Sequence, residues 1–187
     1  SICQSIDPRN KRLRTSILLE TFNNKTILID ASPDLRTQLL RTNTMQLDAV
    51  VITHDHADHT HGVDDLRPFT FGKKGPLPVY TDAYSLDSLT IKFPYIFQRE
   101  IVFKDKAILG GGIPKLDLHP LLPGINTLAS ENFHFHALPH GHGESLCFTH
   151  EKLGYIIDCR EVPDKILKHF HDAKLDLLII DCLRYEP

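Results

Sequence analysis

The sequence predicts an α/β fold in which buried strands alternate with helices. Residues 47–53 form an almost continuous apolar run, which indicates a strand covered on both faces by helices or by another sheet. Strand-like runs are followed by helical stripes of leucine, as at residues 26–30 and then 35–43. Residues 133–136 alternate between Phe and His, so one face of that strand carries both aromatic rings and the other both imidazoles.

Length and composition favour one soluble enzyme-sized domain spanning residues 1–187, long enough to bury a core. A net charge of −3 argues against a nucleic-acid partner, which needs a basic face. No apolar run is long enough to cross a bilayer. The four cysteines are scattered without a C-x-x-C pair, which favours reduced thiols in the cytoplasm. The twelve histidines are the compositional outlier and point towards metal binding.

The first quarter of the chain reads as a hairpin, a helix and a buried strand. Residues 16–20 and 26–30 are short β-rich runs joined by two asparagines, a turn signal. Ser32 followed by Pro33 marks a helix start, and the helix is expected to run to about residue 43. The strand at residues 47–53 then leads directly into a cluster of His and Asp.

The rest of the chain alternates in the same way, with one irregular stretch. Residues 93–123 are rich in Pro and Gly and are expected to be strand fragments on a long excursion. Helices are expected at residues 63–69, 83–93 and 162–171, and strands at 79–81, 133–140, 146–149, 155–158 and 175–180.

The cluster after the buried strand offers five metal-binding side chains, His54, Asp55, His56, Asp58 and His59. His54 and His56 are two residues apart, so in an extended segment they point the same way and can bind one ion. Asp58 and His59 follow after a turn and are better placed to hold a second ion. Imidazole and carboxylate together suit Zn, Mn or Fe. Two ions about 3.5–4 Å apart would activate a water molecule and bind both the attacking and the leaving oxygen of a displacement reaction. The cluster therefore favours metal-assisted hydrolysis over a solvated turn or a structural zinc site.

The motif His54-x-His56-x-Asp58-His59, followed by Gly62, resembles the signature of the metallo-β-lactamase-fold hydrolases. The wider run over residues 27–67 looks closest to the PhnP-like branch, which includes a cyclic-phosphate phosphodiesterase of phosphonate breakdown. The resemblance implies a four-layer αββα sandwich of two mixed β-sheets flanked by helices. It covers nearly the whole chain, and the family's first strand and last segment are expected beyond the two ends shown.

Further ligands must come from other parts of the chain. We expect His140, which ends a strand between a proline and a glycine, to complete the first ion's set, and the resemblance agrees; His142 stays open as the rival. Asp158 is expected to bridge both ions, because a carboxylate has two oxygens and an imidazole cannot bridge in this way. Asp30 and Asp181 also end strands, and we expect each to orient a ligand or cap a helix.

The remaining histidines are expected to have ordinary roles. His134 and His136 could pair as ligands, but a strand face towards solvent or a groove is the simpler interpretation. His169 and His171 are two apart on a helix, cannot share a face, and are expected at the surface. His61 either lines the site or caps a helix.

The resemblance implies two further features near the chain ends. One more histidine for the second ion, and a further acid group, would lie C-terminal to the strand that ends at Asp181. A cysteine-rich zinc loop would end near Cys3; the partner cysteines are absent from the sequence, so we assign no structural metal to it.

We therefore expect a cytoplasmic hydrolase with two divalent transition-metal ions, Zn or Mn. Asp58 would bind metal and orient a metal-bound hydroxide, and the resemblance favours a small, cyclic phosphodiester as substrate. The alternatives are a lactone or thioester hydrolase on the same site, or a non-catalytic metal-binding biosynthetic accessory protein. Arg67, Arg160 and Arg184 follow strand or loop ends and could clamp a phosphate, although ordinary surface arginines are the simpler interpretation. A homodimer is compatible with this assignment, and a membrane partner is not expected.

Overall fold

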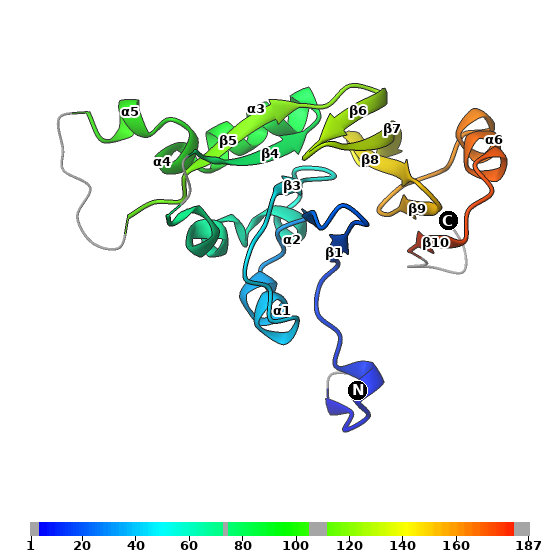
Figure 1. The fold of residues 1–187 in the computed structure, drawn as a ribbon, viewed down its shortest axis with the longest axis horizontal. Helices are drawn as coiled ribbons and strands as arrows, with labels where there is room; N and C mark the ends of the chain where they lie inside the picture. Colours follow the sequence, from blue (N-terminus) through cyan, green and yellow to red (C-terminus); the bar gives the residue numbers. More distant parts are fainter. Residues whose placement is uncertain (1–3, 73–74, 105–111, 182–187) are drawn as a thin grey trace.

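The computed structural model describes residues 4–72, 75–104 and 112–181, and within them ten strands form two five-stranded sheets (Figure 1). Sheet A has the order β1-β2-β3-β4-β5, and sheet B has the order β10-β9-β8-β7-β6. The strands are β1 (Ile17–Glu20), β2 (Thr26–Ile29), β3 (Ala49–Val51), β4 (Leu77–Thr81), β5 (Leu116–Pro120), β6 (Gly124–Leu128), β7 (Glu131–His140), β8 (Gly143–His150), β9 (Leu153–Ile156) and β10 (Leu177–Ile180).

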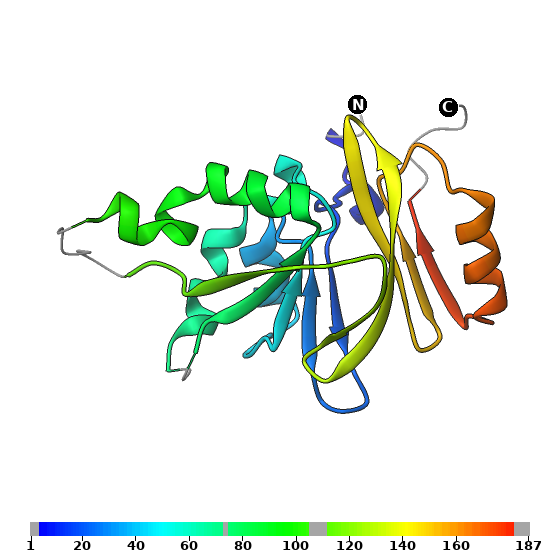
Figure 2. The ribbon, with the colours of Figure 1, turned by 90° about the horizontal axis from the view of Figure 1, so that it is seen from above.

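The longer helices lie on the outer faces of the two sheets (Figure 2). The segments after β2, β3 and β4 cover sheet A, whereas α6 covers sheet B. The helical segments are η2 (Pro8–Asn10), α1 (Leu35–Arg41), α2 (Ala57–Thr60), η3 (Val63–Thr70), α3 (Ala83–Lys92), α4 (Pro94–Phe97), α5 (Arg99–Val102) and α6 (Asp164–Asp172). The expected four-layer sandwich of two mixed sheets is therefore confirmed.

Sheet A is parallel from β2 to β5, and β1 pairs antiparallel with β2 in the hairpin that the sequence predicts. The parallel strands are brought together by crossovers that carry α1, α2 with η3, and α3. Because the strands are parallel, the carboxyl ends of β2 and β3 lie at the same edge of the sheet. Ligand sites in α/β proteins form at such edges, so we expect the functional site in the loops that follow β2 and β3.

Sheet B is antiparallel from β6 to β9, and β10 runs parallel to β9. β7 is ten residues long and pairs with β8 as far as His140 opposite Gly143. The alternation in β7 has the predicted effect: Phe133 and Phe135 are fully buried between the sheets, while His134 and His136 face the opposite side.

Three apolar layers hold the sandwich together. Phe133, Phe148 and Tyr155 from sheet B pack against Ile27 and Val51 from sheet A in the layer between the sheets. A second layer lies between sheet A and its helices, and a third, smaller layer lies between sheet B and α6. β3 has no exposed residue, so the expectation of a strand covered on both faces is confirmed.

Several predicted boundaries were wrong. α1 begins at Leu35 rather than at Pro33, because the Ser32 hydroxyl accepts a hydrogen bond from the Asp34 amide in a preceding turn. Residues 63–70 form a 3₁₀ segment that contains Pro68, which cannot donate an α-helical hydrogen bond. The excursion over residues 93–123 contains α4, α5 and β5, and residues 105–111 lie outside the described part. No described helix is long and apolar enough to cross a membrane.

Candidate metal centre

The predicted metal loop leaves the carboxyl end of β3 at the junction between the two sheets. Thr53 and His54 are buried, and the chain then turns into α2. Gly62 closes the loop against the end of β2, where its amide donates to the Ala31 carbonyl at 2.8 Å. A β-carbon at Gly62 would lie 2.0 Å from the Ser32 carbonyl oxygen, so this close approach requires glycine.

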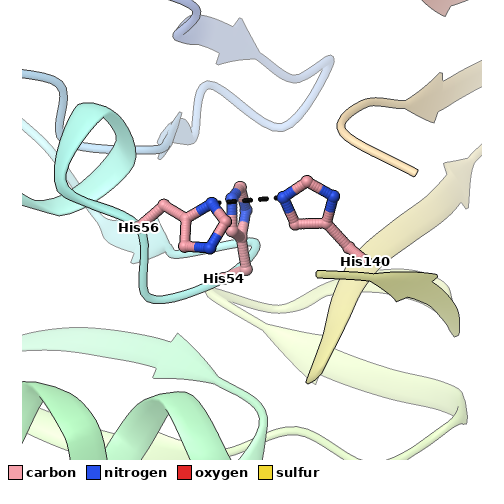
Figure 3. Close-up of side chains that lie close together, drawn as sticks. All are labelled: His54, His56 and His140. Carbon is pink, nitrogen blue, oxygen red and sulfur yellow. Dashed lines mark hydrogen bonds between the residues drawn. The ribbon is translucent and has the colours of Figure 1, made fainter. Parts of the chain in front are cut away.

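Three imidazoles meet in front of the loop (Figure 3). His54 and His56 come from the loop and His140 comes from the end of β7, and one ring nitrogen from each lies within 4.8 Å of the other two. His56 Nδ1 and His140 Nε2 are 3.1 Å apart. His142, the rival for this position, is exposed and does not take part in the group. The geometry therefore favours His140 as the third member.

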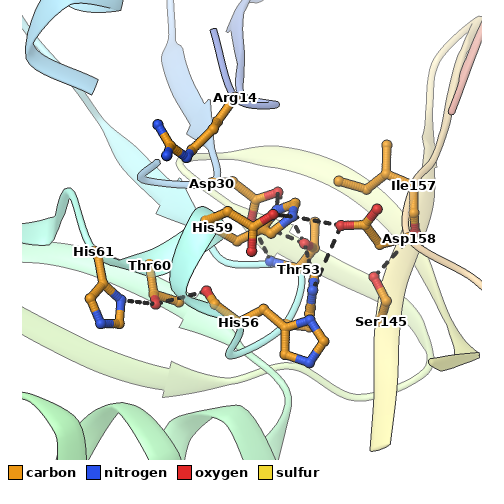
Figure 4. A network of polar contacts seen from close by, with 12 residues as sticks. Arg14, Asp30, Thr53, His56, His59, Thr60, His61, Ser145, Ile157 and Asp158 are labelled. Atoms are coloured by element: carbon orange, nitrogen blue, oxygen red, sulfur yellow. Dashed lines mark hydrogen bonds and ion pairs between the residues drawn. The ribbon is translucent and has the colours of Figure 1, made fainter. Parts of the chain in front are cut away.

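A second group shares His54 with the first and adds His59 and Asp158. Asp158 Oδ2 lies 2.6 Å from His59 Nε2 and 3.7 Å from His54 Nε2. Asp158 enters from sheet B while the histidines enter from sheet A, as Figure 4 shows. Asp158 is therefore within reach of both histidines, and its bridging role stays a prediction.

Asp58 lies at the solvent side of this second group. It occupies the first turn of α2, its side chain is 58 % exposed, and its Oδ2 is 3.6 Å from His59 Nε2. It is outside both tight groups of ligand atoms. Asp58 is thus the carboxylate with open access to water beside the site.

Asp30, at the end of β2, orients two of these histidines. Its fully buried carboxylate accepts hydrogen bonds from the Thr53 amide and hydroxyl at 2.8 and 3.0 Å, and lies 2.9 Å from His59 Nδ1. Since the Thr53 hydroxyl donates to Asp30, it accepts from His54 Nδ1, 3.1 Å away. Both rings therefore carry their proton on Nδ1 and present Nε2 to the centre, the arrangement that suits metal binding.

Charge and burial in the centre match a cation site. Burial, together with the nearby His59 and His56, lowers the pKa of His54 to about 3, so this ring keeps its lone pair. Burial opposes protonation of His59, but its hydrogen bonds with Asp158 and Asp30 raise its pKa to about 10. The hydrogen bond from His59 holds the pKa of Asp158 below its usual value. His59 therefore also carries a proton on Nε2 at neutral pH, directed at Asp158, and a metal ion would have to replace this proton.

The donor set fits a divalent transition metal. His54 Nε2 is buried and has no hydrogen-bond partner among the described residues, so a lone pair points into the centre unused. Buried polar atoms are rarely left in this way unless an ion or water takes up the site. Three imidazoles next to an imidazole–carboxylate pair are ligands of the type that Zn and Mn accept.

Two residues of the loop point elsewhere. Asp55 was expected among the possible ligands, but its carboxylate bonds to Ser88 and to Lys92 of α3, both at 2.5 Å. It therefore fastens the loop to α3. His61 contacts Thr60 at 3.1 Å and packs its ring against Phe93, so it supports the loop from behind.

Asp181 lies near the centre without joining it. Its amide donates to the Ile156 carbonyl at 3.2 Å, which holds the end of β10 beside β9. Burial and the neighbouring Asp158 raise the pKa of its carboxyl group. Cys3, Cys182 and Arg184, which were singled out in the sequence, lie outside the described residues.

We predict that Asp30→Asn weakens metal binding about 10–100-fold while the fold is retained, because the amide cannot accept from all the donors that now fix His54 and His59. The measurement is metal affinity by competition with a chromophoric chelator. Asp48→Asn is the matched control: Asp48 also accepts a strand amide, from Thr26 at 2.9 Å, but at the opposite end of β3. Equal affinities for the two variants would contradict the orienting role.

Comparison with known proteins shows a family match over most of the chain. The family model described as the beta-lactamase superfamily domain matches residues 25–187. The crystal structure of a diphosphatase of the PhnP family superposes with a TM-score of 0.84 at 30% identity, covering 100% of this chain and 67% of that one. Zn²⁺-bound PqqB from Methylobacterium extorquens shares the fold, with a TM-score of 0.64 at 20% identity over 97% of this chain and 65% of that one.

A curated relative from Porphyromonas gingivalis (strain ATCC BAA-308 / W83), named octanoyltransferase, is 32% identical over 185 residues. The match takes in 98% of this chain but only 35% of that protein. The chain thus spans about a third of the length of this relative, whose name describes the whole of it.

Proposed function

Because the chain belongs to the beta-lactamase superfamily, a family of metal-dependent hydrolases, we propose that it is a phosphodiesterase with two divalent metal ions and a small phosphodiester as substrate. One observation carries the proposal most directly: two groups of ligand atoms share His54, and Asp158 reaches into the gap beside His59. The likeness to a PhnP-family diphosphatase supports phosphorus rather than carbon as the reacting atom.

In this proposal each side chain has a defined task. His54, His56 and His140 hold one ion. Asp58 and His59 would hold the other, and Asp158 would be a ligand that both ions share. Asp30 would keep Nε2 of His54 and of His59 turned towards the centre through its contacts with Thr53 and His59 Nδ1.

Bound together, two divalent ions supply a water of lowered pKa and neutralise the charge that develops on a phosphoryl group. Asp58, the exposed acid beside His59, would orient a water molecule at the centre and accept a proton at Oδ2. His54 and His59 are buried, so water and substrate would approach from the side of the exposed Asp58 and the half-buried His140.

Arg160 is the best placed of the predicted phosphate clamps. It follows Asp158 by two residues, its side chain is exposed, and its amide donates to the Pro139 carbonyl at 2.8 Å, next to His140. Arg67 instead points to the Gly112 carbonyl, 3.4 Å away. A guanidinium at Arg160 can form paired hydrogen bonds with two phosphoryl oxygens.

We expect Arg160→Ala to raise KM about 10–100-fold with a smaller change in kcat, the usual cost of losing a hydrogen bond to a charged group. Steady-state kinetics on a phosphodiester substrate measure both constants. Arg41→Ala, at the exposed end of α1, is the control and should leave KM unchanged. An unchanged KM in Arg160→Ala would exclude Arg160 from substrate binding.

The substrate class is tested by assaying the metal-loaded full-length protein on an activated phosphodiester, a lactone and an acyl thioester. The proposal predicts the highest kcat/KM with the phosphodiester. A higher kcat/KM on the thioester would favour acyl chemistry, which the name of the Porphyromonas relative also suggests. Absence of turnover in all three assays by metal-loaded protein would favour a non-catalytic accessory role.

A further inference from the structure

A second group of histidines lies on the outer face of sheet B, away from the centre described above. His134 and His136 come from β7, and His169 comes from α6, which covers that face. One ring nitrogen from each lies within 4.8 Å of the other two. His136 and His140 are four residues apart along β7, a separation of about 13 Å in a strand. The two groups are therefore separate sites.

The rings face one another closely. The centroid of His169 lies 4.2 Å from that of His134 and 4.5 Å from that of His136, and the two strand rings are 4.6 Å apart. All three side chains are half-buried. The expectation that His169 is a surface residue was therefore wrong, because α6 is anchored by Ile166 and Phe170 and turns His169 onto the sheet. His171, by contrast, is 89% exposed, as predicted.

The group has unused ligand capacity. His136 Nε2 is buried and lacks a hydrogen-bond partner among the described residues. Thr149, opposite His134 on β8, is 3.1 Å from His169 Nε2 through its hydroxyl group. Burial and the neighbouring imidazoles lower the pKa of His136 to about 4, and burial also lowers that of His169. The lowered pKa values of His136 and His169 favour the neutral form of these two rings, the form in which imidazole binds metal.

We propose that His134, His136 and His169 bind a divalent transition-metal ion of the zinc type at a site separate from the hydrolytic centre. Three imidazoles suit Zn, Cu or Ni, whereas Mg and Ca prefer oxygen ligands. The fourth position of the ion is open to water, in contrast to closed structural zinc sites with four protein ligands.

Small movements are enough to form the site. A tetrahedral ion about 2.0–2.1 Å from each nitrogen needs nitrogens about 3.3–3.4 Å apart. The three nitrogens lie within 4.8 Å of one another, and the three side chains are half-buried, so they would have to approach by about 1.5 Å at most. Two charged side chains have opposite effects on the pKa values of these histidines. Lys165 lowers the pKa of His136, and Asp172 raises the pKa of His169.

The ion would join α6 to the middle of β7. β9, which leads into Asp158, is followed by α6, so the metal would stabilise the segment that carries this carboxylate. The site would thus add stability to one wall of the hydrolytic centre without touching substrate.

The test compares His169→Gln with His171→Gln, which lies two residues further along the same helix. Each protein is freed of metal, titrated with Zn²⁺ against a competing chelator, and analysed for bound zinc. We expect His169→Gln to bind one equivalent less than wild type, and His171→Gln to bind the same amount as wild type. We also expect the zinc-induced rise in Tm to be smaller in His169→Gln by about 5 °C.

Equal zinc content in wild type and His169→Gln would overturn the proposal. If His169→Gln does not fold, zinc-edge anomalous scattering from wild-type crystals decides. A peak between the three rings, besides any in the hydrolytic centre, supports the site. Peaks only in the hydrolytic centre would show that the outer group binds no ion.

Discussion

Asp58→Asn should reduce turnover at least about 10²-fold, which is the lower end of what a positioned acid–base group supplies. The same substitution should change the folded fraction very little. Asparagine keeps the volume and one oxygen of the side chain. It loses the charge that helps to hold an ion and the lone pair that accepts the water's proton. Because Asp58 is 58% exposed at the start of α2 and lies 3.6 Å from its nearest charged partner, His59, its replacement by asparagine should disturb the packing little.

The measurement is kcat on an activated phosphodiester with Mn or Zn supplied, alongside thermal unfolding. Binding of a non-hydrolysable phosphodiester should survive better than the rate, because it depends partly on groups outside the metal centre. Asp87→Asn is the matched control, an exposed acid on α3 that should leave the rate unchanged. Equal rates for wild type and Asp58→Asn would rule out the proposed role.

Asp158→Ala should weaken the binding of both hydrolytic ions more than about 100-fold, beyond the usual effect of losing an orienting partner. Its carboxylate is the one that approaches both His54 and His59. Asp181→Ala, at the end of the neighbouring strand, should mainly change stability, because Asp181 lies outside the two ligand groups.

Metal content and unfolding temperature of the two variants separate these outcomes. The account requires metal to be lost from Asp158→Ala and retained by Asp181→Ala. The opposite result would mean that the bridging carboxylate has been assigned to the wrong strand end.

The convergence of His54 and His56 could be predicted because the geometry of the loop is local. The spacing of His54 and His56 after a buried strand fixes the direction of both side chains, whatever the rest of the fold does. His140 and Asp158 could be predicted because each follows an apolar run, and strand ends meet at a sheet edge. Both strand-end aspartates that enter the site, Asp30 and Asp158, have positive φ. Aspartate tolerates that conformation better than most residues.

Other features depend on contacts that sequence patterns do not encode. The hairpin between β6 and β7 turns through Ala129 and Ser130, both with positive φ. Such turns usually contain Asn-Gly, so the sequence at this turn did not indicate a hairpin. Asp55 looked like a ligand because of its neighbours, yet Lys92 lies within reach only in the folded chain.

The outer histidine group illustrates the same limit. His134 and His136 were recognisable as a pair on one strand face. Their third partner, His169, comes from a helix more than thirty residues later, and its direction depends on how Phe170 and Ile166 pack. Helical periodicity alone could not show which histidine of α6 turns towards the sheet.

The central claim is that two ions in the loop centre make the protein a phosphodiesterase, and a metal titration of activity tests it most directly. Metal-free protein carrying His169→Gln, which removes the proposed outer site, is titrated with Mn²⁺ or Zn²⁺ while hydrolysis of an activated phosphodiester is followed. The account predicts no rate without metal and a plateau at two equivalents. A rate that is independent of added metal, or a plateau after a single equivalent, would contradict it.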